Sequence, residues 1–232
     1  YMFRYIYGIR PPTRSFFIRG RAVHKGIEHN YKSKIETHED LPLNEVQEVV
    51  SEEFDSMVAE AVWEDSENPG EIKDATMELV SLYHQEVAPK IQPVLIEKFV
   101  EIEIPETNFM LRGYIDLVDI GGYIRDTKTK KATPPQKTVD SSLQLTAYAM
   151  AYRQLTGKTE KGVVLDNLVS LKRGTKYVPL ESQRTELDIR RFINISKSVI
   201  RCIQSGAYCP NPNSMMCSES KCDFWKICQE TF

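Results

Sequence analysis

The hydrophobic residues in the first 91 positions recur at the spacing of helices. In three stretches, apolar side chains return to one face every three or four residues. Pro42 precedes the second stretch, and a polar loop that ends in Pro69-Gly70 separates it from the third. The predicted helices cover Ser15–Tyr31, Leu43–Trp63 and Ile72–Val87.

After residue 91 the pattern changes to that of strands. Val94–Ile104 is rich in Val, Ile and Phe, and Gly162–Leu171 is a short apolar run followed by a short return strand at Lys176–Leu180. Two further stretches have helical spacing, and each ends at a glycine. These helices are Val139–Thr156 and Thr185–Ser205. The order of elements predicts an α/β or α+β domain around a central mixed sheet.

A hairpin is predicted between Arg112 and Lys128, where apolar and polar residues alternate on both sides of Gly121-Gly122. Asp126 and Lys128 are two apart and share a face, and pairing across the turn brings Asp116 close to them. Two carboxylates and one ammonium group predict a metal site beside a charged catalytic group. The alternative is that they occupy the solvated face of the hairpin. Asp119 falls outside this pattern and is expected at the surface.

The candidate ligands suit a hard divalent cation. Asp116, Asp126 and the backbone carbonyl of Thr127 offer oxygen atoms, which Mg²⁺ and Mn²⁺ prefer. A neighbouring Lys128 can position water or stabilise charge that develops on a phosphate. His24 is a further candidate, because a neutral imidazole binds ions such as Mn²⁺. A lone histidine in a helix is otherwise structural or exposed.

Polar and basic residues follow the hairpin. Gln144 and Tyr148 are four apart on a predicted helix and therefore share a face, where they can hold a phosphate or support the lysine. They can equally form an ordinary boundary stripe. Two basic runs, Lys128–Lys137 and Lys172–Lys176, are either solvated loops or surfaces that follow a nucleic-acid backbone.

All five cysteines lie near the C-terminus, beginning with Cys202. Cys217, Cys222 and Cys228 are spaced C-x4-C-x5-C, with Cys209 ahead of them. Clustered thiolates without a nearby histidine favour an iron–sulfur cluster or structural zinc. Cys202 lies within a predicted helix and is expected to be buried.

Composition narrows the classes of function. A hydrophobic fraction of 41% is enough for a core, and a net charge of −3 argues against a generally basic nucleic-acid coat. No apolar run approaches the roughly 18–20 residues that a membrane span needs. We see no signal peptide, so the expected location is cytoplasmic. The chain begins at Tyr1, and we expect further residues upstream.

Taken in order, these motifs resemble those of the PD-(D/E)XK nuclease superfamily, and in particular its RecB-like group. That group includes the AddB nuclease domain, CRISPR-associated exonucleases and many phage exonucleases. The resemblance covers nearly the whole chain and rests on five motifs. They are G-x3-H at Gly20–His24, G-x2-D at Gly113–Asp116, D-x-K at Asp126–Lys128, Q-x3-Y at Gln144–Tyr148 and the terminal cysteines.

The resemblance implies a restriction-endonuclease-like fold and a role for each motif. His24, Asp116 and Asp126 would bind the catalytic metal, and Lys128 would be the catalytic lysine. Gln144 and Tyr148 would be the auxiliary helix pair. Three cysteines would bind a four-iron four-sulfur cluster, namely Cys217, Cys222 and Cys228.

Two departures concern that cluster. The first gap between these cysteines is usually shorter than the x4 found here. The fourth cysteine of the family lies near the N-terminus, and this sequence has none there. Either that ligand lies upstream of Tyr1, or Cys209 replaces it, or the cluster is incomplete; we favour the first.

The sequence therefore predicts one nuclease domain, with a mainly helical part at 1–91, a catalytic α/β core at 92–205 and a cysteine-rich tail at 206–232. Its predicted activity is metal-dependent hydrolysis of DNA by an exonuclease that acts on duplex ends or single strands. Recombination, repair or phage replication is the expected process, with a helicase or recombination partner, in a bacterial or phage-infected cytoplasm. The alternatives are a non-catalytic DNA-binding or scaffold module of the same fold and a zinc-ribbon interaction protein.

Overall fold

The computed structural model describes residues 1–214 and 216–232. The chain forms two compact units. The larger comprises Thr13–Asn194, and the smaller combines Tyr1–Pro12 with Ile195–Phe232. The larger unit contains the whole sheet and all of the residues predicted to carry out catalysis.

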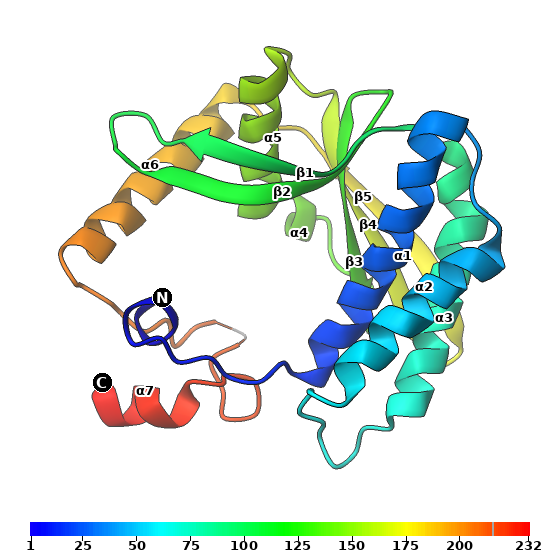
Figure 1. Ribbon diagram of the computed structural model, residues 1–232. Coiled ribbons are helices and arrows are strands. Elements are labelled where there is room, and N and C mark those ends of the chain that lie inside the picture. The colour runs from blue at the N-terminus through cyan, green and yellow to red at the C-terminus, as the bar shows by residue number, and fades with distance from the viewer. Residues whose placement is uncertain (215) are drawn as a thin grey trace. The chain divides into compact units, whose positions relative to one another are not determined.

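A five-stranded mixed sheet forms the centre of the larger unit (Figure 1), which confirms the predicted α/β architecture. Its strands lie in chain order, and neighbours are antiparallel except for β3 and β4, which are parallel. A crossover is therefore needed between β3 and β4, and helices supply it. The strands are β1 (Pro93–Glu103), β2 (Met110–Asp119), β3 (Tyr123–Lys130), β4 (Gly162–Leu171) and β5 (Gly174–Ser182).

Three helices pack on one face of the sheet and enclose the main hydrophobic core. They are α1 (Ser15–Thr37), α2 (Leu43–Val58) and α3 (Pro69–Glu86), followed by the short 3₁₀ turn η2 (Ala88–Lys90). Helix α1 continues past the predicted Tyr31 and ends where His38 adopts a left-handed conformation. Helix α2 ends before the predicted Trp63, because the chain turns back and the Trp63 indole donates a hydrogen bond to the Val58 carbonyl.

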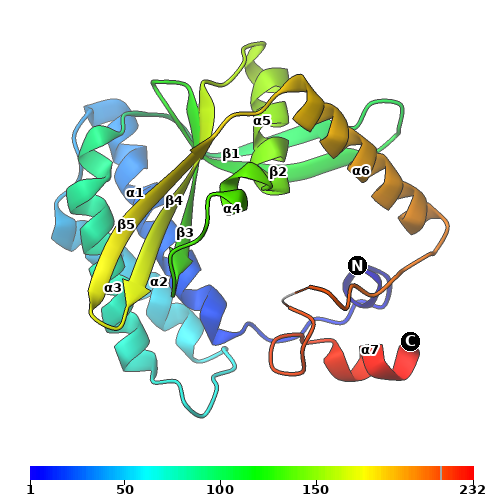
Figure 2. The same cartoon turned by 180° about the vertical axis from the view of Figure 1, so that it is seen from behind.

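The opposite face carries α4 (Lys137–Asp140) and α5 (Leu143–Thr156), which form the crossover (Figure 2). The sequence predicted one helix here, whereas the structure has two. Ser142 separates them, because its hydroxyl accepts a hydrogen bond from the Leu145 amide and so begins α5 as an N-cap. Gly157 ends α5 in the left-handed conformation, as predicted.

Strands β2 and β3 form a fork. They pair only at Leu117–Val118 with Ile124–Arg125, after which β2 stays with β1 and β3 with β4. The prediction that Asp119 lies at the surface is wrong. It is buried at the closed end of the fork, where its carboxylate accepts hydrogen bonds from the Tyr123 amide and the Arg125 guanidinium.

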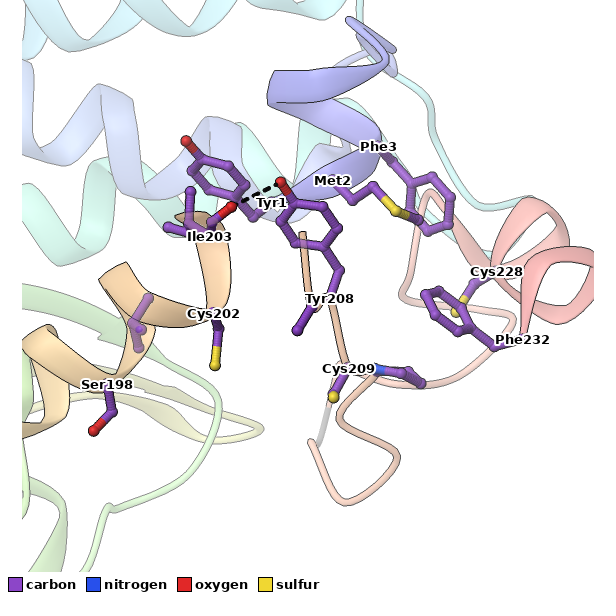
Figure 3. A pocket seen from close by; sticks show the side chains of 13 residues that line it. Tyr1, Met2, Phe3, Ser198, Cys202, Ile203, Tyr208, Cys209, Cys228 and Phe232 are labelled. Atoms are coloured by element: carbon purple, nitrogen blue, oxygen red, sulfur yellow. Dashed lines mark hydrogen bonds between the residues drawn. The ribbon is translucent and has the colours of Figure 1, made fainter. Parts of the chain in front are cut away.

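The smaller unit contains η1 (Met2–Ile6), the second half of α6 (Glu186–Gln204) and α7 (Trp225–Thr231). Aromatic contacts join its two segments, since Phe3 stacks on Phe224 and Tyr1 on Tyr208. A pocket of about 420 Å³ lies within this unit (Figure 3), and Tyr208 at its wall donates a hydrogen bond to the Ile203 carbonyl. None of the helices in the described part of the chain is long and apolar enough to span a membrane.

Candidate active site

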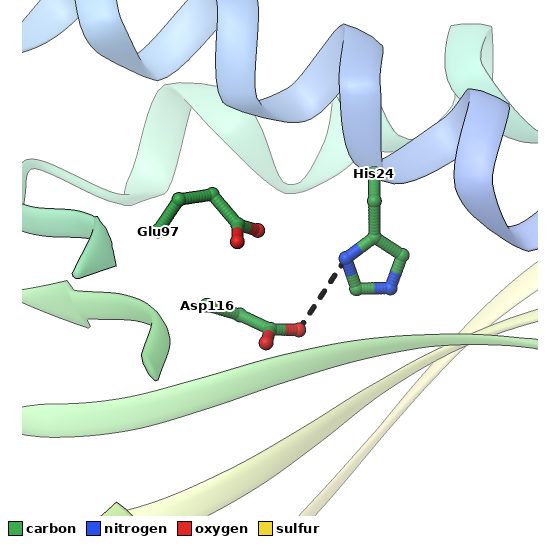
Figure 4. A group of neighbouring side chains, drawn as sticks. All are labelled: His24, Glu97 and Asp116. Carbon is green, nitrogen blue, oxygen red and sulfur yellow. Dashed lines mark ion pairs between the residues drawn. The ribbon is translucent and has the colours of Figure 1, made fainter. Parts of the chain in front are cut away.

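Three potential metal ligands from three different elements meet at the fork (Figure 4). His24 comes from α1, Glu97 from β1 and Asp116 from β2. One ligand atom from each lies within 4.8 Å of the others. All three side chains are partly buried, so the group is shielded in part from solvent.

Hydrogen bonding determines which nitrogen of His24 carries the proton. Nε2 lies 2.6 Å from the carbonyl oxygen of Thr127, and a carbonyl can only accept, so Nε2 must donate. Burial lowers the pKa of His24, which keeps the ring neutral and leaves a lone pair on Nδ1. Nδ1 lies 3.3 Å from Asp116 Oδ2. Two electron-rich atoms therefore face each other, an arrangement that a cation between them stabilises.

Asp116 is held from its other side by α5. Its Oδ1 accepts a hydrogen bond of 3.0 Å from the Tyr148 hydroxyl, which in turn accepts one of 2.8 Å from Gln144. Burial raises the pKa of Tyr148, so its hydroxyl stays protonated and donates. No described residue donates a hydrogen bond to the buried Asp116 Oδ2. That oxygen remains available to a ligand.

Glu97 is a candidate ligand that the sequence analysis missed. It lies within β1, yet its φ of 42° is one that side chains other than glycine rarely adopt. Its neighbours Ile96 and Lys98 pair with Leu117 and Ile115, which places Glu97 opposite Asp116. Counting residues back across the β1–β2 turn would have predicted this position. The unusual backbone conformation is of the kind that concentrates at functional sites.

Asp126 and Lys128 lie next to this group. The Lys128 ammonium is 2.9 Å from Oδ1 and 2.8 Å from Oδ2 of Asp126. Burial raises the pKa of Asp126 to about 7, and the neighbouring charge of Asp116 adds to the effect. Burial raises the pKa of Asp116 as well. Two carboxyl groups at one place therefore resist being ionised together, unless a cation neutralises them.

The donor set fits a divalent cation such as Mg²⁺ or Mn²⁺. Carboxylate oxygens suit both ions, and one imidazole nitrogen suits Mn²⁺ in particular. Three observations support the fit: the Nδ1 lone pair of His24, the undonated Asp116 Oδ2 and the adjoining Glu97 carboxylate.

The structure brings together six of the predicted site residues: His24, Asp116, Asp126, Lys128, Gln144 and Tyr148. Asp126 points toward Asp116 and Lys128, while Glu97 completes the group of ligands around His24. Thr127, predicted as a ligand through its carbonyl, uses that oxygen to accept the hydrogen bond from His24.

A buried ion pair fixes β3 beneath the site. Arg125 binds both oxygens of Asp166 at 2.9 and 2.8 Å, and the Tyr177 hydroxyl donates to the same carboxylate at 2.6 Å. Asp166 is fully buried, so these donors compensate for its lost hydration. Because Arg125 directly precedes Asp126, the pair holds the strand that carries Asp126 and Lys128, the predicted catalytic carboxylate and lysine.

The structure gives no support for an iron–sulfur cluster at the cysteines predicted to bind one. All five thiols are free, and among the described residues no group of metal ligands includes a cysteine. Cys209 and Cys228 line the pocket of the smaller unit with Cys202, whereas Cys217 and Cys222 do not. These observations do not support a four-iron four-sulfur cluster. Cys202 is exposed, so the prediction that it is buried is wrong.

Comparison with protein families identifies the class that this fold and site define. A family model described as the PD-(D/E)XK nuclease superfamily matches residues 1–229. The chain belongs to that superfamily. No curated protein sequence matches it significantly.

Comparison with solved structures supports the fold. The chain is similar to the crystal structure of a "Putative exonuclease" from Eubacterium rectale, with a TM-score of 0.57 and 12% identity. The match covers 97% of this chain and 78% of the other. The five-stranded mixed sheet and flanking helices are those of a restriction-endonuclease-like fold. The similarity to SSO0001 is weaker, with a TM-score of 0.36, 12% identity, and coverage of 79% of this chain and 74% of the other.

Proposed function

We propose that the protein is a metal-dependent deoxyribonuclease, and specifically an exonuclease that acts on DNA ends or single strands. The observation that carries the proposal is the meeting of His24, Glu97 and Asp116 at the fork, next to Asp126 and Lys128. Membership of the PD-(D/E)XK superfamily supports hydrolysis of phosphodiester bonds. The similarity to a structure described as an exonuclease supports the fold only.

Each residue has a distinct task in this proposal. His24, Glu97 and Asp116 would hold Mg²⁺ or Mn²⁺, and such an ion would supply Lewis-acid polarisation of the phosphate and a lowered pKa for a bound water. Gln144 and Tyr148 position Asp116 through their chain of hydrogen bonds. Lys128 places a positive charge where negative charge develops on the phosphate, and Asp126 orients its ammonium group.

Asp126 can also take up and release a proton near neutral pH. With a pKa of about 7, it exchanges its proton near neutral pH, and an incoming cation favours the ionised form. The ionised Asp126 would then add a further negative charge beside the cation and could serve as an additional ligand.

The wider setting of the proposed activity follows from the family alone. DNA recombination, repair or phage replication in a bacterial cytoplasm, with a helicase or recombination partner, suits the RecB-like group that the motifs resemble. The cysteines do not support an iron–sulfur cluster in this structure, and the proposed chemistry uses none.

The decisive test is digestion of end-labelled single-stranded and duplex DNA with Mg²⁺ or Mn²⁺. Lys128→Ala is expected to lower kcat by about 100-fold or more, because it removes a charge that acts mainly in the transition state. Lys130→Ala is the matched control, since Lys130 lies two residues further along the same strand and forms no described contact with the two site carboxylates.

Equal loss of rate in both lysine variants would indicate a general electrostatic effect and contradict the assignment of Lys128. A parent protein that binds DNA but hydrolyses none with either ion would favour the non-catalytic alternative. Circular dichroism of each variant shows whether the fold is retained.

A further inference from the structure

Two exposed aromatic side chains lie beside the candidate site on the β1–β2 hairpin. Phe99 is 46% exposed and Tyr114 is 54% exposed. They pair directly across the two strands, with ring centroids 5.3 Å apart in an edge-to-face arrangement. The nearby Val100 and Ile115 are buried, so the aromatic pair lies on the exposed face of the hairpin, whose tip also exposes Phe109, Met110 and Leu111.

The aromatic pair shares a face of the hairpin with the candidate metal ligand Asp116. Tyr114 precedes Asp116 by two residues in β2, and Phe99 pairs directly with Tyr114 across the two strands. Residues two apart in a strand point to the same side and lie about 7 Å from each other. A nucleotide whose phosphate lies at the site can therefore reach the two rings with its own base or with that of its neighbour.

The charges beyond the rings favour a base over a phosphate. From the rings to the tip, the hairpin carries Glu101, Glu103 and Glu106 against Arg112, which already pairs with Glu101, while Lys98 precedes Phe99 on the side toward the site. A polyanionic backbone is repelled there, whereas an uncharged base stacks on exposed aromatic rings without regard to its sequence.

We propose that Phe99 and Tyr114 form a stacking platform for one unpaired base of the DNA strand whose phosphate lies at the fork. This proposal rests on the proposed nuclease function and adds a preference for DNA with unpaired bases. Bases inside a duplex are stacked on each other, so the platform favours single strands and frayed or overhanging ends.

Binding without hydrolysis tests the platform separately from catalysis. A fluorescent single-stranded oligonucleotide is titrated with protein in EDTA, using the double variant Phe99→Val with Tyr114→Thr. Both replacements are β-branched and keep strand propensity while removing the rings. Affinity is expected to fall roughly 10-fold, which is typical for loss of stacking on one base. The variant Phe99→Tyr with Tyr114→Phe keeps both rings and is expected to bind like the parent.

An oligonucleotide with one abasic position, moved along the strand, identifies the stacked base. The parent is expected to lose affinity at one position, and the double variant is expected to lose none there, because the same contact is already absent. Leu171→Ala, which removes an exposed apolar side chain at the β4–β5 turn, is the matched control and is expected to leave binding unchanged.

The outcomes distinguish the two proposals. Double-variant binding equal to that of the parent, or an equal loss for blunt duplex and single strand, contradicts the platform. Failure of the parent to cleave DNA with Mg²⁺ or Mn²⁺ contradicts the proposed nuclease function, while the binding measurements in EDTA still decide whether the rings contact a base.

Discussion

At the scale of single residues, the candidate site gathers groups that are unfavourable together without a cation. Nδ1 of His24 and Oδ2 of Asp116 face each other 3.3 Å apart, and the ring proton of the neutral His24 lies on Nε2, toward the Thr127 carbonyl. The carboxylate of Glu97 is the third potential ligand in this group. The backbone of Glu97 has a positive φ, a conformation that costs about 1–3 kcal/mol. Such strain at one residue is retained where the surrounding fold imposes it, and here it directs a carboxylate toward the other two ligands.

The strain at Glu97 can be tested by comparing the stabilities of its Gly and Ala variants, because at an ordinary strand position the Ala variant is the more stable of the two. We expect Glu97→Gly to be more stable than Glu97→Ala by about 1 kcal/mol, because glycine accepts a positive φ without cost. At Glu101, in the same strand, we expect the opposite order, since glycine weakens an ordinary strand position. Urea unfolding of the four metal-free variants measures both differences.

The same variants test Glu97 as a ligand. Both Glu97 variants are expected to weaken Mn²⁺ binding, measured by calorimetry, and both Glu101 variants are expected to retain it. Undiminished binding in Glu97→Gly would remove this residue from the ligand set.

At the scale of elements, the site depends on where strands separate and on how α5 is anchored. The fork between β2 and β3 leaves space for α1 to bring His24 against the Thr127 carbonyl. Helix α5 supplies Gln144 and Tyr148 from the opposite face. Arg184 fixes the start of α5, because its buried guanidinium donates to Thr146 Oγ1 at 2.8 Å and to the Val139 carbonyl at 2.6 Å.

We expect Arg184→Ala to lower the free energy of unfolding by about 2–4 kcal/mol, because it removes the buried hydrogen bonds of a charged donor to both α4 and α5. Arg190→Ala, at an exposed position of α6, is the control and is expected to change stability by less than about 0.5 kcal/mol. Urea unfolding measures both. Similar midpoints for the two variants would show that Arg184 does not anchor the helix.

At the scale of the whole molecule, the two ends of the chain belong to one compact unit, joined by aromatic contacts such as Phe3 with Phe224. The larger unit contains the sheet and the candidate site. Burial of carboxyl groups in that unit makes the stability of the protein depend on pH and on metal.

Asp126 makes the metal-free protein less stable as pH rises. The pKa of Asp126 is raised to about 7 in the folded state, whereas an ordinary Asp has a pKa of about 4. Between these two pH values, the native protein retains a proton on Asp126 that the unfolded chain has lost. This stabilisation is complete at low pH and is lost as pH rises through 7. In EDTA, the fall in melting temperature between pH 5 and pH 8 is therefore expected to be smaller in Asp126→Asn than in the parent. For a chain of this size, each kcal/mol of lost stability corresponds to a fall in melting temperature of about 2–4 °C.

The control for this measurement is Asp65→Asn, which changes an exposed carboxylate in a loop. It is expected to follow the parent at both pH values. Saturating Mn²⁺ is expected to reverse the trend for the parent, because the ionised carboxylates bind the cation. A parent whose stability in EDTA rises from pH 5 to pH 8 as steeply as it does with Mn²⁺ would contradict the raised pKa.

Local patterns in the sequence determined most of the elements. Helix α2 begins at the predicted Leu43, and β4 spans the predicted Gly162–Leu171. The reason is physical: periodicity and capping residues act within a few positions, so they are visible in a single segment. Predictions were wrong where a tertiary contact decided the position of a side chain. Asp119, for example, is buried because its carboxylate accepts a hydrogen bond from Arg125.

The sequence also indicated which residue types the site uses, through the order of its motifs. Tertiary structure alone decided that Glu97 joins His24 and Asp116, that Thr127 fixes the proton of His24 on Nε2, and that the rings of Phe99 and Tyr114 are exposed beside the site. Ligand sets, protonation states and exposure depend on distances between segments remote in sequence. Those distances are set by how β2 separates from β3 and how α1 and α5 pack at the fork.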